Sequence, residues 1–536
     1  MKRFSGSVCA TVIEEVQDLQ VMMFYGFRQN HLWIVTFPRP ARSSVMKKIV
    51  LWIISILSAM FTYAQSAALK QRLDSISLNQ QWAFDIPGYV AAVIKDNKVI
   101  YLRAIGVENT VTGKPVTARS DFHMASVSKP FTATAILHLR DKGRLHLDSP
   151  LVYYLPYFRM KGEDHTKITL RHMLTHSSGI PDVTDYEWDH PQTEEGSAEL
   201  YARSFADKPL DFPPGAEFRY SNAAFDLLAA VIAAVSGLSF EEYIRTNILL
   251  PSGMRSSSFL LSDIPGGRRT APHEFDAALK LLPSTVYPYN RIHAPSSTLH
   301  SDLMDMIGWA RVWLNKGAGQ DGSLMQESTW KEMLTPQLRV NDEFQVCLSW
   351  FETVIDHRRI YFHSGGDTGF RTFVGFAPSD NIAVILMGNN DLFDSAQAGF
   401  RYFRALFNAG PVAPMVKPIH LELRKLILRN GINSVKERYE REKRSHPLRY
   451  DTSAGSILQL AGLLFDHGHR NETTEVLQWG ASLYPVDGSW LEHLGDVHAA
   501  WQDKQAALIY YRRALALTVD PNRKPLEEKM KGLEKQ

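Results

Sequence analysis

Cysteine is almost absent from this chain. Only Cys9 and Cys347 occur among 536 residues, so neither a disulfide framework nor a cysteine-based zinc site can be built from the sequence. A strong charge of one sign is missing as well, because 59 lysine and arginine residues face 57 aspartate and glutamate residues. No basic run carries interleaved aromatic residues, so we expect no nucleic-acid partner.

The motifs of several enzyme classes are also missing. The chain has no Gly-x-Ser-x-Gly, which argues against an α/β-hydrolase, and no Walker or dinucleotide-binding glycine loop. His172 and His176 lie four apart on what the pattern predicts to be one helix, but without His-Glu-x-x-His a structural role is favoured over zinc. His467 and His469 flank a turn glycine and indicate surface. We therefore expect no metal and no cofactor.

Long apolar runs are rare, and the clearest lies near the N-terminus. "MKKIVLWIISILSAMFTYAQS" begins at Met46 with two lysines, continues apolar, and ends in small residues. This order predicts a signal peptide over residues 46–64, cleaved after Ala64, with an uncleaved membrane anchor as the alternative. Residues 1–45 would then be a non-native extension from a start codon placed too far upstream. We expect a secreted or periplasmic protein with no membrane span after signal removal.

Residues 65–410 have the pattern of one mixed domain. β-rich runs over 89–106 and again over 370–390 each surround a turn signal and predict hairpins. Between them, helical periodicity appears over 128–142 and after the Pro-Gly turn in 212–237. Strands at both ends with helices between them predict an α+β domain whose sheet joins the two ends.

The composition changes after residue 410. Residues 411–450 contain a proline-rich linker and a charged helical stretch. In residues 451–536, Ala461 and Gly495 occupy matching positions 34 residues apart, the tetratricopeptide period. The second copy resembles such a repeat closely and the first is degenerate. We expect a small all-α repeat domain, packed with the charged helix before it, that serves for packing or for docking a protein partner.

Ser126 and Lys129 form one of three Ser-x-x-Lys matches in the chain, with Ser44/Lys47 and Ser328/Lys331. Ser126 stands at the predicted start of a helix, near free backbone N–H groups and the positive end of the dipole. Lys129 shares its face, and in a dry site a lysine of lowered pKa can accept the serine proton. The alternative is an ordinary helix start with an exposed lysine.

Two further motifs follow along the chain. In Tyr220-Ser221-Asn222 the first and third side chains of an extended segment face one way, where a tyrosine near a cation can act as a base and an amide can bind a carbonyl. In His363-Ser364-Gly365-Gly366 the glycines permit close approach of a substrate, and a backbone N–H can point at an oxyanion. The alternatives are an aromatic residue with an asparagine helix cap, and a glycine-rich turn.

In this order the three motifs resemble the penicillin-recognising serine hydrolases, in particular the class C β-lactamase-like group with its D-amino-acid peptidases and esterases. Segments such as "HMASVSKPFTATAI" and "PPGAEFRYSNAAFDLLA" extend the resemblance over residues 82–408. It implies a β-lactamase-like antiparallel sheet with a helical subdomain.

The resemblance also implies roles for individual residues. Ser126 would be the acylated nucleophile, Lys129 its proton acceptor or electrostatic partner, and Tyr220 the general acid and base. Asn222 would orient the substrate beside the strand His363, Ser364, Gly365 and Gly366, and the backbone N–H groups of Ser126 and Gly366 would form the oxyanion hole.

His363 departs from the family pattern, because β-lactamases proper usually carry lysine there, whose charge helps to hold a substrate carboxylate. An imidazole is largely neutral at pH 7. We expect an exported serine hydrolase that forms an acyl-enzyme with an ester, an amide or a D-amino-acid-containing peptide. The alternatives are a peptidoglycan DD-peptidase or β-lactamase and, from another class, a non-hydrolytic scaffold that uses its repeats. Loops 183–205 and 263–300 would set substrate choice.

Overall fold

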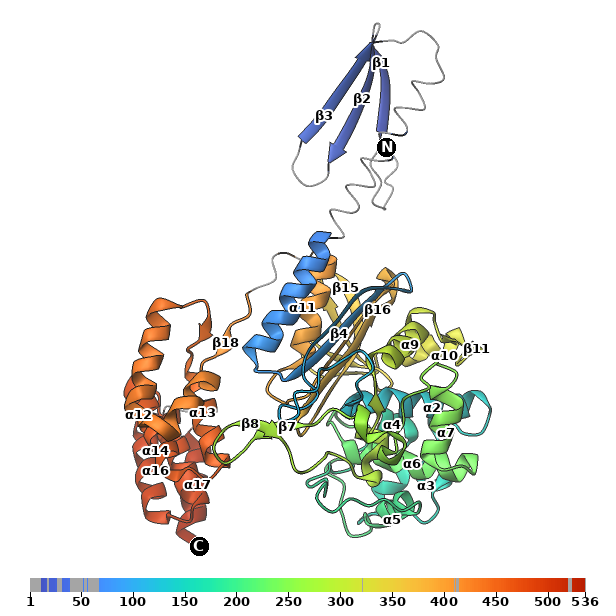
Figure 1. Cartoon of the computed structure of the whole chain (residues 1–536). Coiled ribbons are helices and arrows are strands. Elements are labelled where there is room, and N and C mark those ends of the chain that lie inside the picture. The colour runs from blue at the N-terminus through green and yellow to red at the C-terminus, as the bar shows by residue number, and fades with distance from the viewer. Residues whose placement is uncertain are drawn as a thin grey trace. The chain divides into compact units, whose positions relative to one another are not determined.

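The chain forms two units, residues 1–70 and 71–536, in the computed structural model (Figure 1). The structure describes residues 11–16, 19–26, 31–38, 52, 55, 67–320, 322–408, 410, 414–518 and 523–535. In the first unit, three antiparallel strands pair in the order of the chain: β1 (Thr11–Val16), β2 (Leu19–Gly26) and β3 (His31–Pro38). Apart from residues 52 and 55, the predicted signal peptide lies outside the described residues.

The second unit is built on an eight-stranded antiparallel sheet of order β12-β13-β14-β15-β16-β17-β4-β5. The C-terminal strand β17 pairs directly with the N-terminal strand β4, with Ile385 opposite Ala92, which confirms the predicted α+β domain. The strands are β4 (Gly88–Lys95), β5 (Lys98–Gly106), β12 (Leu338–Arg339), β13 (Gln345–Val346), β14 (Phe351–Ile355), β15 (Arg358–Asp367), β16 (Phe370–Ala377) and β17 (Ile382–Gly388).

Helices cover both faces of this sheet, which explains why all seven residues of β17 are buried. On one face α11 (Ser395–Phe407) approaches so closely that a Cβ on Gly399 would lie 2.3 Å from the Phe373 ring. On the other face α9 (Leu303–Leu314) stacks Trp313 on Phe376 at 5.3 Å. Since Phe373 and Phe376 are three apart on β16, they point to opposite faces.

A helical subdomain occupies the stretch between β5 and β12. Its centre is α2 (Lys129–Asp141) packed on α6 (Asn222–Ser236). Ser221 caps α6 by accepting a hydrogen bond from the Ala224 N–H at 3.1 Å, and Gly237 ends the helix in the left-handed conformation. Smaller elements are β6 (Phe122–His123), α3 (Leu151–Tyr154), α4 (Leu170–Leu174), α5 (Ser197–Arg203), α7 (Phe240–Ile244), β7 (His273–Phe275), β8 (Leu281–Pro283), α8 (Ala294–Ser297), β9 (His300–Ser301), β10 (Ala318–Gly319), β11 (Gly322–Ser323) and α10 (Glu327–Met333).

Among the described residues no single helix is long and apolar enough to cross a membrane. Helix α6 is long and apolar enough for a span only when residues 240–249 are counted with it, and the chain bends by 77° between the two. Most of α6 is buried in the protein core.

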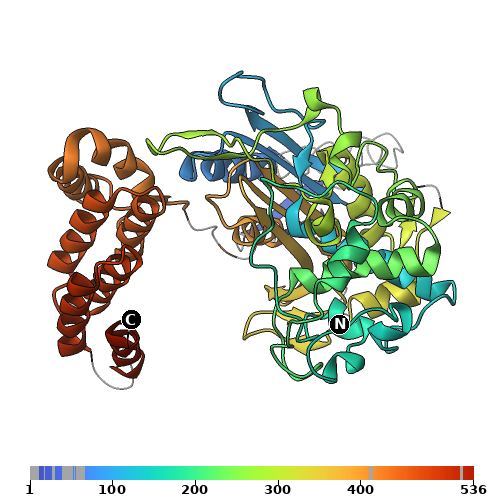
Figure 2. The same ribbon diagram turned by 90° about the horizontal axis from the view of Figure 1, so that it is seen from below.

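The C-terminal region is mainly helical (Figure 2), as predicted. It has a hydrophobic core of its own. Close helix crossings occur where a Cβ on Gly480 would meet the Trp490 ring at 2.0 Å and one on Gly495 the Tyr511 ring at 2.4 Å. The charged helix α12 contributes Val435 to this core, which confirms that it packs with the helices after it. Assignment of the helices as tetratricopeptide repeats stays a prediction. The elements are β18 (Lys417–Pro418), α12 (His420–Ser445), β19 (Tyr450–Asp451), α13 (Ala454–Asp466), α14 (Arg470–Leu483), α15 (Ser489–Ala500), α16 (Lys504–Leu517) and α17 (Arg523–Lys535).

Candidate active site

Ser126 lies in a 3₁₀ turn, η1 (Ala125–Ser128), that leads directly into α2. The preceding Ala125 is fully buried and has a φ of 48°, a conformation that costs an alanine about 1–3 kcal/mol. The turn is held from both sides, because Met124 N–H donates to the Leu299 carbonyl at 2.7 Å and Leu299 N–H donates to Ser128 Oγ at 2.9 Å. A strained turn thus presents Ser126, which is partly exposed, at a helix entrance.

Lys129 is fully buried beneath Ser126, so the alternative of an exposed lysine is wrong. Its Nζ donates three hydrogen bonds, to Ser126 Oγ at 2.9 Å, to Asn222 Oδ1 at 2.6 Å and to the Ser296 carbonyl at 3.0 Å. The ammonium group therefore has an oxygen acceptor for each of its three protons. Sequence reasoning missed Ser296, since a backbone carbonyl carries no signature of residue type.

Burial lowers the pKa of Lys129 to about 8, because a charged amine loses its hydration in the protein interior. The carboxylates of Asp226, Asp367 and Asp182 oppose this shift and raise the pKa. A substantial fraction of Lys129 is consequently neutral near pH 8. A neutral amine 2.9 Å from a hydroxyl can accept its proton.

Asn222 is held in one orientation by Asp182, which sequence reasoning also missed. Asp182 Oδ1 accepts from the Asn222 N–H at 2.5 Å, and its Oδ2 accepts from Asn222 Nδ2 at 3.2 Å. The amide oxygen is thereby turned toward Lys129. Nothing in the sequence around Asp182 indicates a partner forty residues later along the chain.

Tyr220 lies over the same lysine, with its ring centroid 4.9 Å from Lys129 Nζ. Burial raises the pKa of Tyr220, the nearby carboxylates raise it further, and a hydrogen bond with Ser126 opposes the shift. The phenol is therefore protonated at neutral pH. The raised pKa favours Tyr220 as a proton donor or relay in the free protein rather than as a phenolate that is already deprotonated.

His176 supports the Tyr220 ring from behind. The two rings stack at 4.2 Å, and His176 Nδ1 accepts from the Ser221 N–H at 3.2 Å. The prediction that His172 and His176 share one helix is wrong. Helix α4 ends at Leu174, and His176 follows in a left-handed turn with a φ of 54°. That turn is what brings the imidazole under Tyr220.

The His363–Gly366 strand reaches the serine turn along an edge of β15. Strand β14 pairs with β15 only as far as Phe362, opposite Phe351, so this edge is unpaired within the sheet from His363 onward. A Cβ on Gly365 would lie 2.4 Å from the Met124 carbonyl oxygen and 3.1 Å from Ser126 N. Glycine is thus required for the approach of strand and turn. The oxyanion hole from the N–H groups of Ser126 and Gly366 stays a prediction.

His363 is almost fully buried, with 2% of its surface exposed. Burial and the charge of Lys129 lower its pKa to about 3, so the imidazole is neutral at pH 7. Its Nδ1 donates to the Ser364 carbonyl at 2.7 Å, whereas Nε2 has no hydrogen-bond partner in the part of the chain that the structure describes. Where β-lactamases usually carry a lysine, this site holds an uncharged acceptor.

Two buried carboxylates complete the surroundings and were not predicted. Asp367, directly after Gly366, accepts a hydrogen bond from Ser297 Oγ and lies 2.7 Å from His123 Nε2. Asp226, one turn after Asn222 on α6, lies 2.7 Å from His293 Nδ1. Their charge keeps the pKa of Lys129 from falling further.

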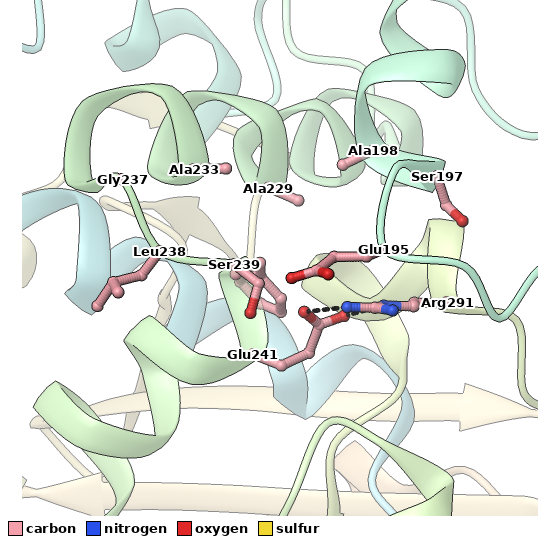
Figure 3. Close-up of a pocket in the computed structure, with 11 residues that line it drawn as sticks. Glu195, Ser197, Ala198, Ala229, Ala233, Gly237, Leu238, Ser239, Glu241 and Arg291 are labelled. Atoms are coloured by element: carbon pink, nitrogen blue, oxygen red, sulfur yellow. Dashed lines mark hydrogen bonds and ion pairs between the residues drawn. The ribbon is translucent and has the colours of Figure 1, made fainter.

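A pocket of about 240 Å³ lies apart from this cluster, between α5, α6 and α7 (Figure 3). Glu241 and Arg291 form a two-fold hydrogen-bonded ion pair in it, at 2.7 and 3.1 Å, with Glu195 beside them. None of the predicted catalytic residues lines it. The described residues contain no cluster of histidine, cysteine and carboxylate side chains that would hold a metal ion.

Comparison with known proteins adds three kinds of match. A family model described as Beta-lactamase matches residues 74–406. Protein flp of Staphylococcus aureus (strain COL) is 26% identical over 323 residues, 60% of this chain and 63% of that protein. Esterase EstB of Burkholderia gladioli is 30% identical over 220 residues, 37% of this chain and 53% of that protein. This chain thus spans less than two thirds of the length of these relatives.

Solved structures share the fold. A penicillin-binding protein homologue from Pyrococcus abyssi, described as octameric, matches with a TM-score of 0.57 and 23% identity, over 67% of this chain and 81% of that one. A class C beta lactamase from Rhodobacter sphaeroides matches with a TM-score of 0.50 and 19% identity, over 63% of this chain and 98% of that one. At this identity the likeness concerns the fold alone.

Proposed function

Because the chain belongs to the beta-lactamase family, we propose that it hydrolyses an ester or amide through an acyl-enzyme on Ser126. The observation that carries the proposal is the distance of 2.9 Å from Lys129 Nζ to Ser126 Oγ, in surroundings that lower the pKa of the lysine to about 8. The site thus joins a nucleophile to a base that is partly neutral at physiological pH.

In the proposed acylation, Ser126 Oγ attacks the substrate carbonyl and its proton passes to neutral Lys129. Tyr220 donates its proton to the leaving oxygen or nitrogen and regains one from Lys129. The N–H groups of Ser126 and Gly366 stabilise the oxyanion. Deacylation runs in reverse: Tyr220 passes its proton to neutral Lys129 as it takes a proton from the attacking water, Lys129 then returns a proton to Ser126 Oγ, and the acid is released.

We propose a substrate that needs no fixed positive charge beside the β15 edge. Neutral His363 offers an acceptor where a lysine would offer a cation. Tyr186 and Trp188, in the loop expected to set substrate choice, stack at 4.9 Å and suit an apolar or aromatic group. Esters and neutral amides, including peptides of D-amino acids, fit these features. Peptidoglycan DD-peptidase or β-lactamase activity is the alternative.

Labelling with a fluorophosphonate tests the nucleophile. The full chain should be labelled, and Ser126→Ala should not. Ser328→Ala is the matched control, because Ser328 stands in another Ser-x-x-Lys but is exposed. Hydrolysis of p-nitrophenyl esters, nitrocefin and D-alanyl peptides then ranks the substrates. A Ser126→Ala protein that hydrolyses esters at the wild-type rate contradicts the proposal, and a wild-type chain that takes neither a fluorophosphonate nor a fluorescent penicillin favours the scaffold alternative.

We also propose export through residues 46–64, on the basis of their charge and hydrophobicity pattern alone. N-terminal sequencing of the protein from culture medium and periplasmic extract should find Gln65 as the first residue. Recovery of the uncut chain from the membrane fraction would support the anchor alternative instead.

A further inference from the structure

A hairpin of the catalytic domain is held by the C-terminal helices (Figures 1 and 2). Strands β7 and β8 pair from His273 opposite Pro283 to Phe275 opposite Leu281. Leu279, at the tip, is 1% exposed and belongs to the hydrophobic core of the C-terminal helices. The C-terminal helices therefore bury the tip of a hairpin whose strands belong to the catalytic domain.

Polar groups of the helices bind the backbone of the same tip. His467 Nε2 lies 2.9 Å from the Phe275 carbonyl oxygen, and His469 Nε2 lies 2.7 Å from that of Ala277. These are the two histidines that flank a turn glycine; both are half-buried, and each lies within hydrogen-bond distance of a carbonyl of the hairpin. Such contacts recognise backbone in a defined position, which apolar burial alone does not do.

Arg424 of α12 makes the third carbonyl contact. It donates to the Leu279 carbonyl at 2.5 Å and to Asp85 Oδ2 at 3.1 Å. Its guanidinium also lies 4.3 Å from the centroid of the Phe275 ring. One buried cation thus ties α12 both to the hairpin and to the segment that enters β4.

The other end of the hairpin segment lies at the proposed active site. After β8 the chain runs to Arg291, which pairs with Glu241, and to His293, which pairs with Asp226. It then offers the Ser296 carbonyl to Lys129. The segment 272–300 is therefore bound at its tip by the helices and at its end by the lysine.

The start of the segment touches the site as well. A Cβ on Gly369, in the turn after Asp367, would lie 2.4 Å from Pro272 Cβ and 2.7 Å from His273 N. Farther along, the Tyr287 ring packs edge-on against His123 at 6.4 Å, and His123 contacts Asp367. Movement of the hairpin would consequently displace Gly369 and His123, which lie next to Asp367, as well as the Ser296 carbonyl.

We propose that the C-terminal helices brace segment 272–300, so that Leu279, Arg424, His467 and His469 are positioning residues for substrate binding. Their effect reaches the site through the segment and not through contact with substrate. Only the kinetic part of this inference rests on the proposed hydrolase function, because the order of the segment can be measured without a substrate.

The test compares Leu279→Asp with Leu282→Asp in the full chain. Leu279 is buried in the core of the C-terminal helices. A carboxylate at this position should therefore detach the tip from the helices and leave the core of the catalytic domain intact. Leu282 lies in the same hairpin with 37% of its surface exposed, and its substitution should change little. Leu279→Met, which keeps an apolar side chain at this position, should behave like the wild type.

We expect faster hydrogen exchange in residues 273–283 and 284–300 for Leu279→Asp alone. For a p-nitrophenyl ester we expect KM to rise roughly five-fold, with kcat changed by less than about two-fold. If hydrogen exchange in Leu279→Asp is unchanged in 273–283 or in 284–300, the proposed bracing role is contradicted. Faster exchange with an unchanged KM contradicts it as well. If the wild-type chain has no esterase activity, the hydrolase proposal fails while the exchange result still decides this one.

Arg424→Gln tests the same contact from the helical side. It should raise exchange in 273–283, whereas Arg512→Gln, at a largely exposed position on α16, should not. Faster exchange confined to α12, with the hairpin unaffected, would contradict a bracing role for Arg424.

Discussion

Lys129 and His363 are two buried bases of the candidate site, and their surroundings differ. Lys129, at the start of α2, meets three oxygen acceptors within 3.0 Å and the charge of three carboxylates. His363, on the β15 edge, meets one carbonyl and the positive charge of Lys129. Burial lowers the pKa of both, to about 8 for the lysine and about 3 for the histidine.

The difference shows that burial alone does not decide what a base can do. Carboxylates in the next layer keep Lys129 within the physiological range, where it can exchange a proton. His363 has no such support and stays neutral. The α2 side of the site therefore holds the group that titrates, and the β15 side holds a fixed, uncharged acceptor.

Substitution of Lys129 by methionine should have the largest effect on this contrast. It removes the proton acceptor, and we expect kcat/KM for a p-nitrophenyl ester to fall by roughly 10²- to 10⁴-fold. His363→Gln, a neutral replacement, should cost far less. Steady-state kinetics with circular dichroism of both proteins make the comparison. Similar losses from the two substitutions would place both bases in the chemical step.

The pH profile should follow Lys129 and not His363. Since the lysine accepts a proton only when neutral, kcat/KM should rise about ten-fold per pH unit below pH 8 and level off above it, by roughly a hundred-fold in all from pH 6. His363, with its pKa of about 3, is neutral over that whole range. The profile of His363→Gln should therefore match the wild type, and a flat wild-type profile would exclude Lys129 as the base.

Introducing a charge on the β15 side should change substrate preference. In His363→Lys, the ratio of kcat/KM for a carboxylate-bearing substrate such as nitrocefin to that for a neutral ester should rise by about ten-fold, because a cation pairs with the carboxylate. The matched control is His363→Gln. An unchanged ratio in a folded His363→Lys protein would mean that the carboxylate is not bound at this position.

The smallest effect expected is that of Asp182→Asn. The substitution keeps the shape but weakens the hydrogen bonds that orient Asn222, so kcat/KM should fall by about five-fold while Ser126 is still labelled. Asp185→Asn, on the same exposed loop, is the control. Equal losses in the two variants would indicate a general charge effect rather than orientation of Asn222.

Local pattern was sufficient for much of the fold. The hairpin signals around residues 96 and 380 became β4–β5 and β16–β17, and their pairing across the whole domain followed from the α+β arrangement. The helix start just after Ser126 was visible because helical periodicity is a property of neighbouring residues. Where the pattern depended on one backbone conformation, as at His176, the prediction was wrong.

By itself, the sequence determined the fold class, the family resemblance and the motifs that contain Ser126, Lys129, Tyr220 and Asn222, which contact one another in the structure. Only the tertiary structure decided that Lys129 is buried, that Asp182 turns Asn222, and that the Ser296 carbonyl completes the lysine shell. It also showed where His467 and His469 bind. The physical reason is that pKa values and backbone contacts depend on which distant groups surround a residue, and this information is absent from the identity of the residue and its neighbours.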